Sequence, residues 1–321
     1  MSTSARPLKL TVVMYHYVRD PGDAAEAGSG IPGLPFAHFA VQLDYLTRHH
    51  VMITWPHLRD GLQGHRTLPP SACLLTFDDG VRDHYLNVFP ALRARSLSGL
   101  FFALARREAA GLALAHKIHF LLAALGLEGL RQAVWARLTP AQGELFRQAE
   151  RHYQLQFDPL SLDGQINVFK SILQRDLSAE AETILGELFA QHIGSETDTA
   201  REHYLKPDQI REMGAGGMHF GGHSHSHPWF DWIGAEARAD EVAASAAWLQ
   251  EIEPGPWAFA YPYGGLSPAV PRLLKAHGFA AAFTTVEQTM HTSPYLIGRL
   301  DGEALTVNDV TVETREGQRY A

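Results

Sequence analysis

The stretch Leu74-Leu75-Thr76-Phe77-Asp78-Asp79-Gly80 decides how this chain is organised. The residues from Cys73 to Phe77 are apolar except for Thr76, and a short apolar run that ends at a turn-forming glycine predicts a buried β-strand. Adjacent side chains in a strand point to opposite faces, so the two carboxylates can share a task only if the strand ends there. At the carboxyl end of a strand in an α/β barrel, both would reach the mouth of the barrel. The alternative is an ordinary strand that ends in an Asp-Gly turn.

A second motif, Gly221-Gly222-His223-Ser224-His225-Ser226-His227-Pro228, lies far downstream after a short predicted strand, Gly217 to Phe220. Neutral imidazole is the commonest metal ligand in proteins, and three histidines within five residues form a dense donor cluster. His223, His227 and one carboxylate from the first motif would form a metal site with open positions for water. The alternative is a solvated loop, because the chain holds 18 histidines.

These motifs, followed by Phe259-Ala260-Tyr261-Pro262-Tyr263-Gly264, resemble the polysaccharide deacetylases with nodulation-protein-B homology. Met14-Tyr15-His16-Tyr17-Val18 and the segment 205–213 are further similarities, and the resemblance covers roughly 8–100 and 203–301. It implies an α/β fold, a distorted (β/α) barrel of about seven strands. It also implies a hydrolase that removes acyl groups from sugars with one divalent metal ion.

The resemblance further implies a role for each motif residue. Asp79, His223 and His227 are expected to hold the metal, for which zinc is favoured because two imidazoles, one carboxylate and open water positions suit it. Asp78 is expected to be the catalytic base. The backbone N–H of Tyr263 is expected to receive the oxyanion, since a donor in a rigid turn is preorganised. Tyr261 and Pro262 are expected to contact the substrate. Trp229 is a further candidate, because an aromatic ring beside a polar site can stack on a sugar face; the alternative for it is partly buried packing.

The chain departs from the family pattern in two places. Trp257 and Ala258 stand where many members carry an arginine that braces the catalytic aspartate, and we expect Arg299 to brace Asp78 instead. Many members also carry a late histidine as the general acid, and 296–301 holds none. His16 and His291 are the two alternatives for the proton donor.

Composition places the chain among ordinary globular proteins, with 45% apolar and 19% charged residues among 321. The net charge of -8 argues against a nucleic-acid partner. Cys73 is the only cysteine, which excludes an intrachain disulfide. The N-terminal residues show no secretory pattern, and no apolar stretch reaches the ~18 residues of a transmembrane helix. We therefore expect a cytoplasmic protein, with the inner face of the membrane as an alternative; the oligomeric state stays open.

A run of helical patterns interrupts the strand–helix alternation. Within 107–202 the helical periods fall at Leu112 to Leu125, 130–138, 141–155, 166–173 and 177–193, which indicates an all-helical insertion in a single domain that spans 1–321. Its helices are expected to form one wall of the active-site pocket; the rival view places them outside, for dimerisation or membrane docking. The segment 58–70 is expected to be irregular.

The function expected from these patterns is removal of an N-acetyl or other N-acyl group from an amino sugar in glycan or surface-polysaccharide biosynthesis. The substrate would be an acylated amino sugar or glycan, free or linked to a nucleotide or lipid carrier. The alternatives are a deformylase of a linked amino sugar and a catalytically silent carbohydrate-binding protein of the same fold. An intact Asp78-Asp79-His223-His227 set favours an enzyme, because a lectin has no need of a base beside a metal.

Overall fold

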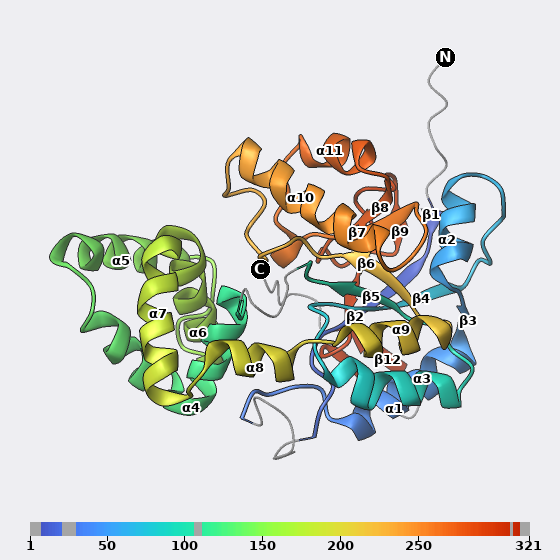
Figure 1. The fold of residues 1–321 in the computed structure, drawn as a ribbon. Helices are drawn as coiled ribbons and strands as arrows, with labels where there is room; N and C mark the ends of the chain where they lie inside the picture. The colour runs from blue at the N-terminus through green and yellow to red at the C-terminus, as the bar shows by residue number, and fades with distance from the viewer. Residues whose placement is uncertain (1–7, 21–29, 106–110, 309–310, 315–321) are drawn as a thin grey trace.

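A computed structural model of the chain describes residues 8–20, 30–105, 111–308 and 311–314. It shows a curled parallel β-sheet flanked by helices, with a separate group of helices extending from one side (Figure 1). The predicted distorted barrel of about seven strands is confirmed. Among the described residues, none of the helices combines the length and apolarity that crossing a membrane requires.

The main sheet has the strand order β10-β2-β4-β5-β6-β7-β8, and all neighbouring strands are parallel. A short strand, β3, pairs with β4 beside this path. The strand bounds are β2 Thr11–Tyr15, β3 Val51–Met52, β4 Ala72–Phe77, β5 Leu100–Ala103, β6 His219–Gly222, β7 Trp257–Ala260, β8 Phe279–Phe283 and β10 Leu300–Asp301. The two small antiparallel pairs are β1 Leu8–Lys9 with β9 Met290–His291, and β11 Leu305–Asn308 with β12 Thr311–Thr314.

The segment 297–301 connects the two ends of the curled sheet. On one side Ile297 forms a parallel bridge with Phe283 of β8, and on the other Leu300 and Asp301 pair with Val13 and Met14 of β2. The sheet therefore curls far enough for the carboxyl ends of its first and last strands to face one another. Parallel strands in a barrel place their carboxyl ends around one mouth, where active sites form.

Six helices pack around the sheet because each has one apolar face. In α1, for example, Phe39, Leu43 and Leu46 are buried at helical spacing. The segment Trp55–Leu62 forms helix α2, so the prediction of an irregular 58–70 is wrong over its first residues; the Thr54 hydroxyl accepts the His57 N–H and caps this helix. The bounds of the six are α1 Phe36–His49, α2 Trp55–Leu62, α3 Phe89–Ala94, α9 Pro207–Ala215, α10 Ala235–Gln250 and α11 Val270–Ala276.

Five further helices, in the region of the predicted insertion, lie between β5 and β6 in the chain: α4 Leu114–Trp135, α5 Pro140–Tyr153, α6 Leu162–Ser171, α7 Ser178–His192 and α8 Glu196–His203. Residues 107–110 of that region lie outside the described residues. The helices pack around a second apolar cluster, which contains Leu121, Phe146 and Phe189 and also includes Tyr17, Ile31 and Val81 from the barrel part of the chain. Gly126, with φ of 68°, interrupts α4 between two of the predicted helical segments.

Candidate active site

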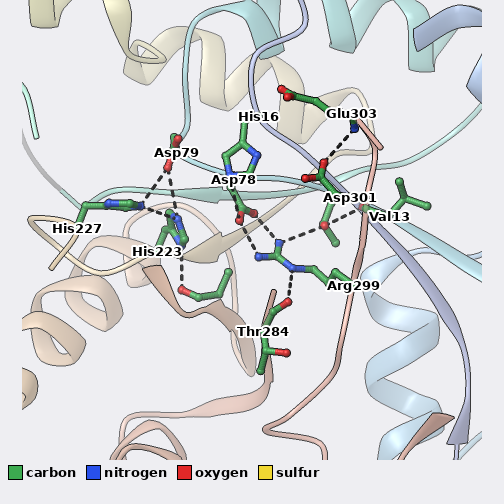
Figure 2. A network of polar contacts seen from close by, with 12 residues as sticks. Val13, His16, Asp78, Asp79, His223, His227, Thr284, Arg299, Asp301 and Glu303 are labelled. Carbon is green, nitrogen blue, oxygen red and sulfur yellow. Dashed lines mark hydrogen bonds and ion pairs between the residues drawn. The ribbon is translucent and has the colours of Figure 1, made fainter. Parts of the chain in front are cut away.

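The motif residues meet at the carboxyl ends of the strands. Asp78 and Asp79 follow β4, and the histidine motif follows β6. His16 follows β2 and lies near Asp78, Asp79, His223 and His227 (Figure 2). Tyr263 follows β7 and lines the same cavity, so four strands deliver side chains to one mouth. Gly80, which ends the first motif, has φ of 65°, and a Cβ on it would lie 2.5 Å from the Cβ of Ala103. A glycine is therefore required for the chain to turn away directly after the two carboxylates.

Asp79, His223 and His227 present three ligand atoms to one point and are a candidate metal site. The Oδ1 atom of Asp79 lies 3.4 Å from Nε2 of His223 and 3.3 Å from Nε2 of His227, and the two Nε2 atoms are 3.1 Å apart. Donors at the corners of a tetrahedron around zinc, with metal–nitrogen distances of about 2.0–2.1 Å, lie about 3.3–3.4 Å from one another. The observed spacing therefore fits a zinc-sized ion.

Hydrogen bonding leaves two of the three facing atoms, Nε2 of His223 and Oδ1 of Asp79, with lone pairs for a cation. His223 contacts the Ala260 carbonyl through Nδ1 at 2.8 Å, and because a carbonyl only accepts, the proton of the neutral ring lies on Nδ1 and Nε2 carries a lone pair. Among the described residues the buried Oδ1 of Asp79 has no hydrogen-bond donor. A buried carboxylate oxygen without a donor is costly, and a metal ion would satisfy it.

The backbone is strained at this site. Of the five non-glycine residues with positive φ among the described residues, four lie here: Asp79, Ser224, His227 and Tyr263, with φ of 74°, 67°, 65° and 57°. Left-handed backbone costs a non-glycine residue about 1–2 kcal/mol, and such strain is typical of functional sites. Two of the three candidate metal ligands are thus held in unfavourable backbone conformations by the surrounding fold.

Asp78 is held apart from the metal ligands by Arg299. The guanidinium donates two hydrogen bonds of 2.7 Å to its two carboxylate oxygens, and Arg299 Nε donates to the Thr284 carbonyl at 3.0 Å (Figure 2). Both side chains are almost fully buried, at 0% and 2% exposure. Burial raises the pKa of Asp78, but Arg299 and His223 outweigh it and hold this pKa below its ordinary value. The carboxylate is therefore ionised near neutral pH and able to accept a proton.

Neighbouring groups also set the charge of the triad. Burial raises the pKa of Asp79, but the imidazoles of His116, His223 and His227 hold it well below its ordinary value. Burial lowers the pKa of His227 to about 4, against the opposing effect of Asp79. The ionised carboxylate beside the neutral imidazole of His227 is the protonation state that metal binding requires, whereas at His223 the effect of burial is outweighed by Asp78 and Asp79, which raise the pKa of this ring.

The comparisons with known proteins agree with this geometry. A family model described as polysaccharide deacetylase matches residues 184–296, which include both histidines of the triad and the turn at Tyr263. The resemblance to polysaccharide deacetylases is confirmed. The matched region does not include Asp78 and Asp79, so their place beside the histidines comes from the structure. A search of curated protein sequences finds no match.

Several solved deacetylase structures share the fold. The Streptococcus pyogenes deacetylase PplD, in complex with acetate, aligns with a TM-score of 0.55 at 15% identity, covering 92% of this chain and 93% of that one. IcaB from Ammonifex degensii gives 0.53 at 20% identity, with 91% of each chain covered. A de-N-acetylase from Aggregatibacter actinomycetemcomitans gives 0.53 at 15% identity, covering 92% and 96%. At these identities the likeness shows a shared fold.

A cavity of about 460 Å³ opens over the deacetylase-like site. Asp78, Asp79, His223 and His227 lie among its lining residues on the barrel side. The opposite wall comes from α4 and α6, which contribute Ala115, His119, Leu122, Asn167 and Lys170. Helices of the predicted insertion thus line the pocket, as expected from the alternative in which they form one of its walls.

The structure separates the two proton-donor candidates. His16 lines the cavity, with its side chain 37% exposed and Nε2 4.0 Å from Oδ2 of Asp78. His291 is buried, and its ring contacts the Leu10 carbonyl at 2.9 Å and accepts the Gly298 N–H at 3.2 Å. Leu10 immediately precedes β2, so His291 lies at the amino end of this strand, away from the mouth of the barrel. The alternative that makes His291 the general acid is therefore wrong.

The three expected substrate contacts, Tyr261, Pro262 and Trp229, are all buried and do not line the cavity. Tyr261 is fully buried, and its hydroxyl donates to the Tyr295 carbonyl. Trp229 is 4% exposed because its indole stacks on the ring of Tyr263 and under the guanidinium of Arg175. Pro262 is buried as well, so within 261–263 only Tyr263 lines the cavity. Of the aromatic residues after the histidine motif, Trp229 and Phe230 are buried, whereas Trp232 is 53% exposed.

The site contains residues that the sequence analysis missed, all from the helical region. His116 Nε2 lies 3.2 Å from Oδ2 of Asp79. One turn further along α4, the ring of His119 lies between Lys170 and Tyr17. Its Nε2 is 3.1 Å from Nζ of Lys170, and its Nδ1 is 3.2 Å from the Tyr17 hydroxyl. The signal was present in the sequence, because histidines at positions i and i+3 share one face of a helix that is otherwise apolar there.

Proposed function

We propose that this chain is a metal-dependent hydrolase that removes an N-acyl group, acetyl in the first place, from an amino sugar within a glycan. The observation that carries the proposal is the pairing of two differently held carboxylates. Asp79 faces two imidazoles at metal-ligand spacing, while its neighbour Asp78 is buried, ionised and bound to Arg299. One carboxylate is thus placed to bind a cation and the other to accept a proton.

Zinc is the ion that we propose for the Asp79, His223 and His227 site. When bound there, it would lower the pKa of a water ligand and polarise the acyl carbonyl. Asp78 would take the proton of the attacking water, because its carboxylate is ionised and lies in the same cavity. Arg299 would keep that carboxylate in one orientation through its two hydrogen bonds.

The two remaining roles are assigned to Tyr263 and His16. The turn at Pro262 fixes the backbone of Tyr263, whose N–H we propose as donor to the oxyanion. His16 lines the cavity next to Asp78 and would give a proton to the departing amine.

The proposal is tested with an acylated amino-sugar oligomer as substrate. An acylated amino sugar linked to a lipid or nucleotide carrier is the alternative substrate. The purified protein is stripped with a chelator, reloaded with Zn²⁺ and given oligomers of N-acetylated or N-formylated amino sugars. We expect acid and free amine to appear in equal amounts only with the reloaded protein. Equal rates before and after stripping would contradict metal dependence, and the absence of both acid and amine with the reloaded protein would contradict N-deacylation of these oligomers.

Two histidine variants test the metal site itself. The double variant His223→Ala/His227→Ala is expected to stay folded and lose both bound metal and activity. His225→Ala is the matched control, because it removes a histidine of the same loop that lies outside the triad. The main-chain N–H of residue 225 bonds to Glu241 and is unaffected by that change. Full metal occupancy in the double variant would overturn the assignment.

A further inference from the structure

The two carboxylate oxygens of Asp79 face different parts of the molecule. Oδ1 faces the histidines of the candidate metal site. Oδ2 faces Nε2 of His116 at 3.2 Å, and His116 lies in the first turn of α4 with none of its surface exposed. His116 is outside the group of atoms that could share one ion. Its position is therefore that of a partner to the carboxylate and not of a metal ligand.

Tyr204 holds His116 in this position from the other end of the helical region. Its hydroxyl lies 2.7 Å from Nδ1 of His116 and accepts the backbone N–H of Ala113 at 3.0 Å. A tyrosine hydroxyl that donates to Nδ1 leaves the ring proton on Nε2, which is the atom that faces Asp79. The contact therefore places a proton donor against the second oxygen of the carboxylate.

The backbone on both sides of Tyr204 is also tied to the chain directly after Asp79. Leu205 N–H donates to the Gly80 carbonyl at 2.9 Å, Arg82 N–H donates to the His203 carbonyl at 2.7 Å, and Tyr204 forms an antiparallel bridge with Val81. The start of the helical region, through Ala113 and His116, and its end, through 203–205, thus meet at the Asp79 turn.

We propose that His116, oriented by Tyr204, is a positioning residue for the metal-binding carboxylate, so that the helical region is part of the metal centre. This inference rests on the proposed function. Asp79 is held in left-handed backbone, with φ of 74°, and needs contacts on both oxygens to fix the plane of its carboxylate. Partners of ligating carboxylates act in this way, and losing one typically weakens metal binding about 10–100-fold.

The test is the dissociation constant for Zn²⁺, measured on the full chain by competition with a chelating dye and without any substrate. We expect His116→Leu to weaken Zn²⁺ binding about 10–100-fold. His116→Gln should recover part of this loss, because its amide offers an N–H near the position of Nε2. Tyr204→Phe should weaken binding in the same direction but less, since it removes only the hydroxyl. His192→Gln, an exposed histidine on α7, is the control and should leave the constant unchanged.

The outcomes separate this inference from the proposed function. A native chain that binds no Zn²⁺ would overturn both. A native chain that binds Zn²⁺, together with a folded His116→Leu variant within about twofold of it, would overturn only the positioning role. If His116→Leu does not fold, Tyr204→Phe decides: native affinity in this folded variant refutes the inference, and weakened affinity supports it.

Discussion

Replacing Arg299 with methionine tests the buried ion pair with Asp78. The change leaves the Asp78 carboxyl 2% exposed and without the two 2.7 Å hydrogen bonds that it receives in the native chain. At an effective dielectric constant of about 20, opposite charges about 4 Å apart attract by about 4 kcal/mol. Breaking a buried pair from one side usually costs about 3–5 kcal/mol. We therefore expect Arg299→Met to lower the free energy of unfolding by about 3–5 kcal/mol.

Denaturant unfolding of four proteins measures the interaction itself. The four are the native chain, Arg299→Met, Asp78→Asn and the double variant, all at one fixed concentration of Zn²⁺. Each single variant leaves one buried charge or dipole without its partner, whereas the double variant removes both charges. The double variant should therefore be more stable, by about 2 kcal/mol or more, than the sum of the two single losses predicts.

An exposed ion pair provides the matched control. Arg147 and Glu144 lie 3.0 Å apart on α5, with side chains 47% and 51% exposed. Solvent screens such pairs, so the same cycle there should give a much smaller coupling energy than the buried pair. Additive losses for Arg299 and Asp78, within about 0.5 kcal/mol, would refute the reasoning that the pair is an energetic unit.

Three further predictions follow from single positions. Asp78→Asn should keep bound Zn²⁺ but lose about 10²–10⁴-fold in turnover; turnover near the native rate would exclude Asp78 as the base. Gly80→Ala should lower the free energy of unfolding, measured by chemical denaturation, by about 2–4 kcal/mol, since it combines left-handed backbone with a clash against Ala103. Gly64→Ala is the control: its φ is 76°, but a Cβ there would meet no neighbouring atom within 4 Å, so the loss should be only about 1–2 kcal/mol. Burial lowers the pKa of His203 well below its ordinary value, so the unfolded chain binds a proton that the folded chain does not, and stability is lost as pH falls below about 6.5. His203→Leu should reduce that loss and add about 1–3 kcal/mol at neutral pH, because neither ring nitrogen has a hydrogen-bond partner among the described residues; an unchanged pH dependence in thermal melts would contradict this.

The strands of the sheet were predictable because each is a short apolar run with a clear stop. The prediction from Cys73 to Phe77 matches β4, and the strand predicted from Gly217 to Phe220 overlaps β6, His219–Gly222. Helix α2 was missed because its eight residues are too few for a periodic pattern and it begins at Trp55-Pro56, where a proline in the first turn also suits a loop. The last strand of the sheet, β10, has only two residues, since its backbone leaves β8 at Ile297 to join β2.

The sequence by itself determined which residue types end the strands, and so which side chains were candidates for chemistry at the mouth of a barrel. Asp78, Asp79, His223 and His227 lie in local patterns, and local patterns depend on neighbours along the chain. Only the tertiary structure decided the partner of each. Arg299 is 221 positions from Asp78, and His116 reaches Asp79 from a helix outside every motif. Whether Trp229 is open to a sugar or buried under Arg175 likewise depends on how distant segments pack. Hydrogen bonds and burial act over a few ångströms of space whatever the separation along the chain, so a sequence pattern can name the groups but not the contacts that set their orientation and charge.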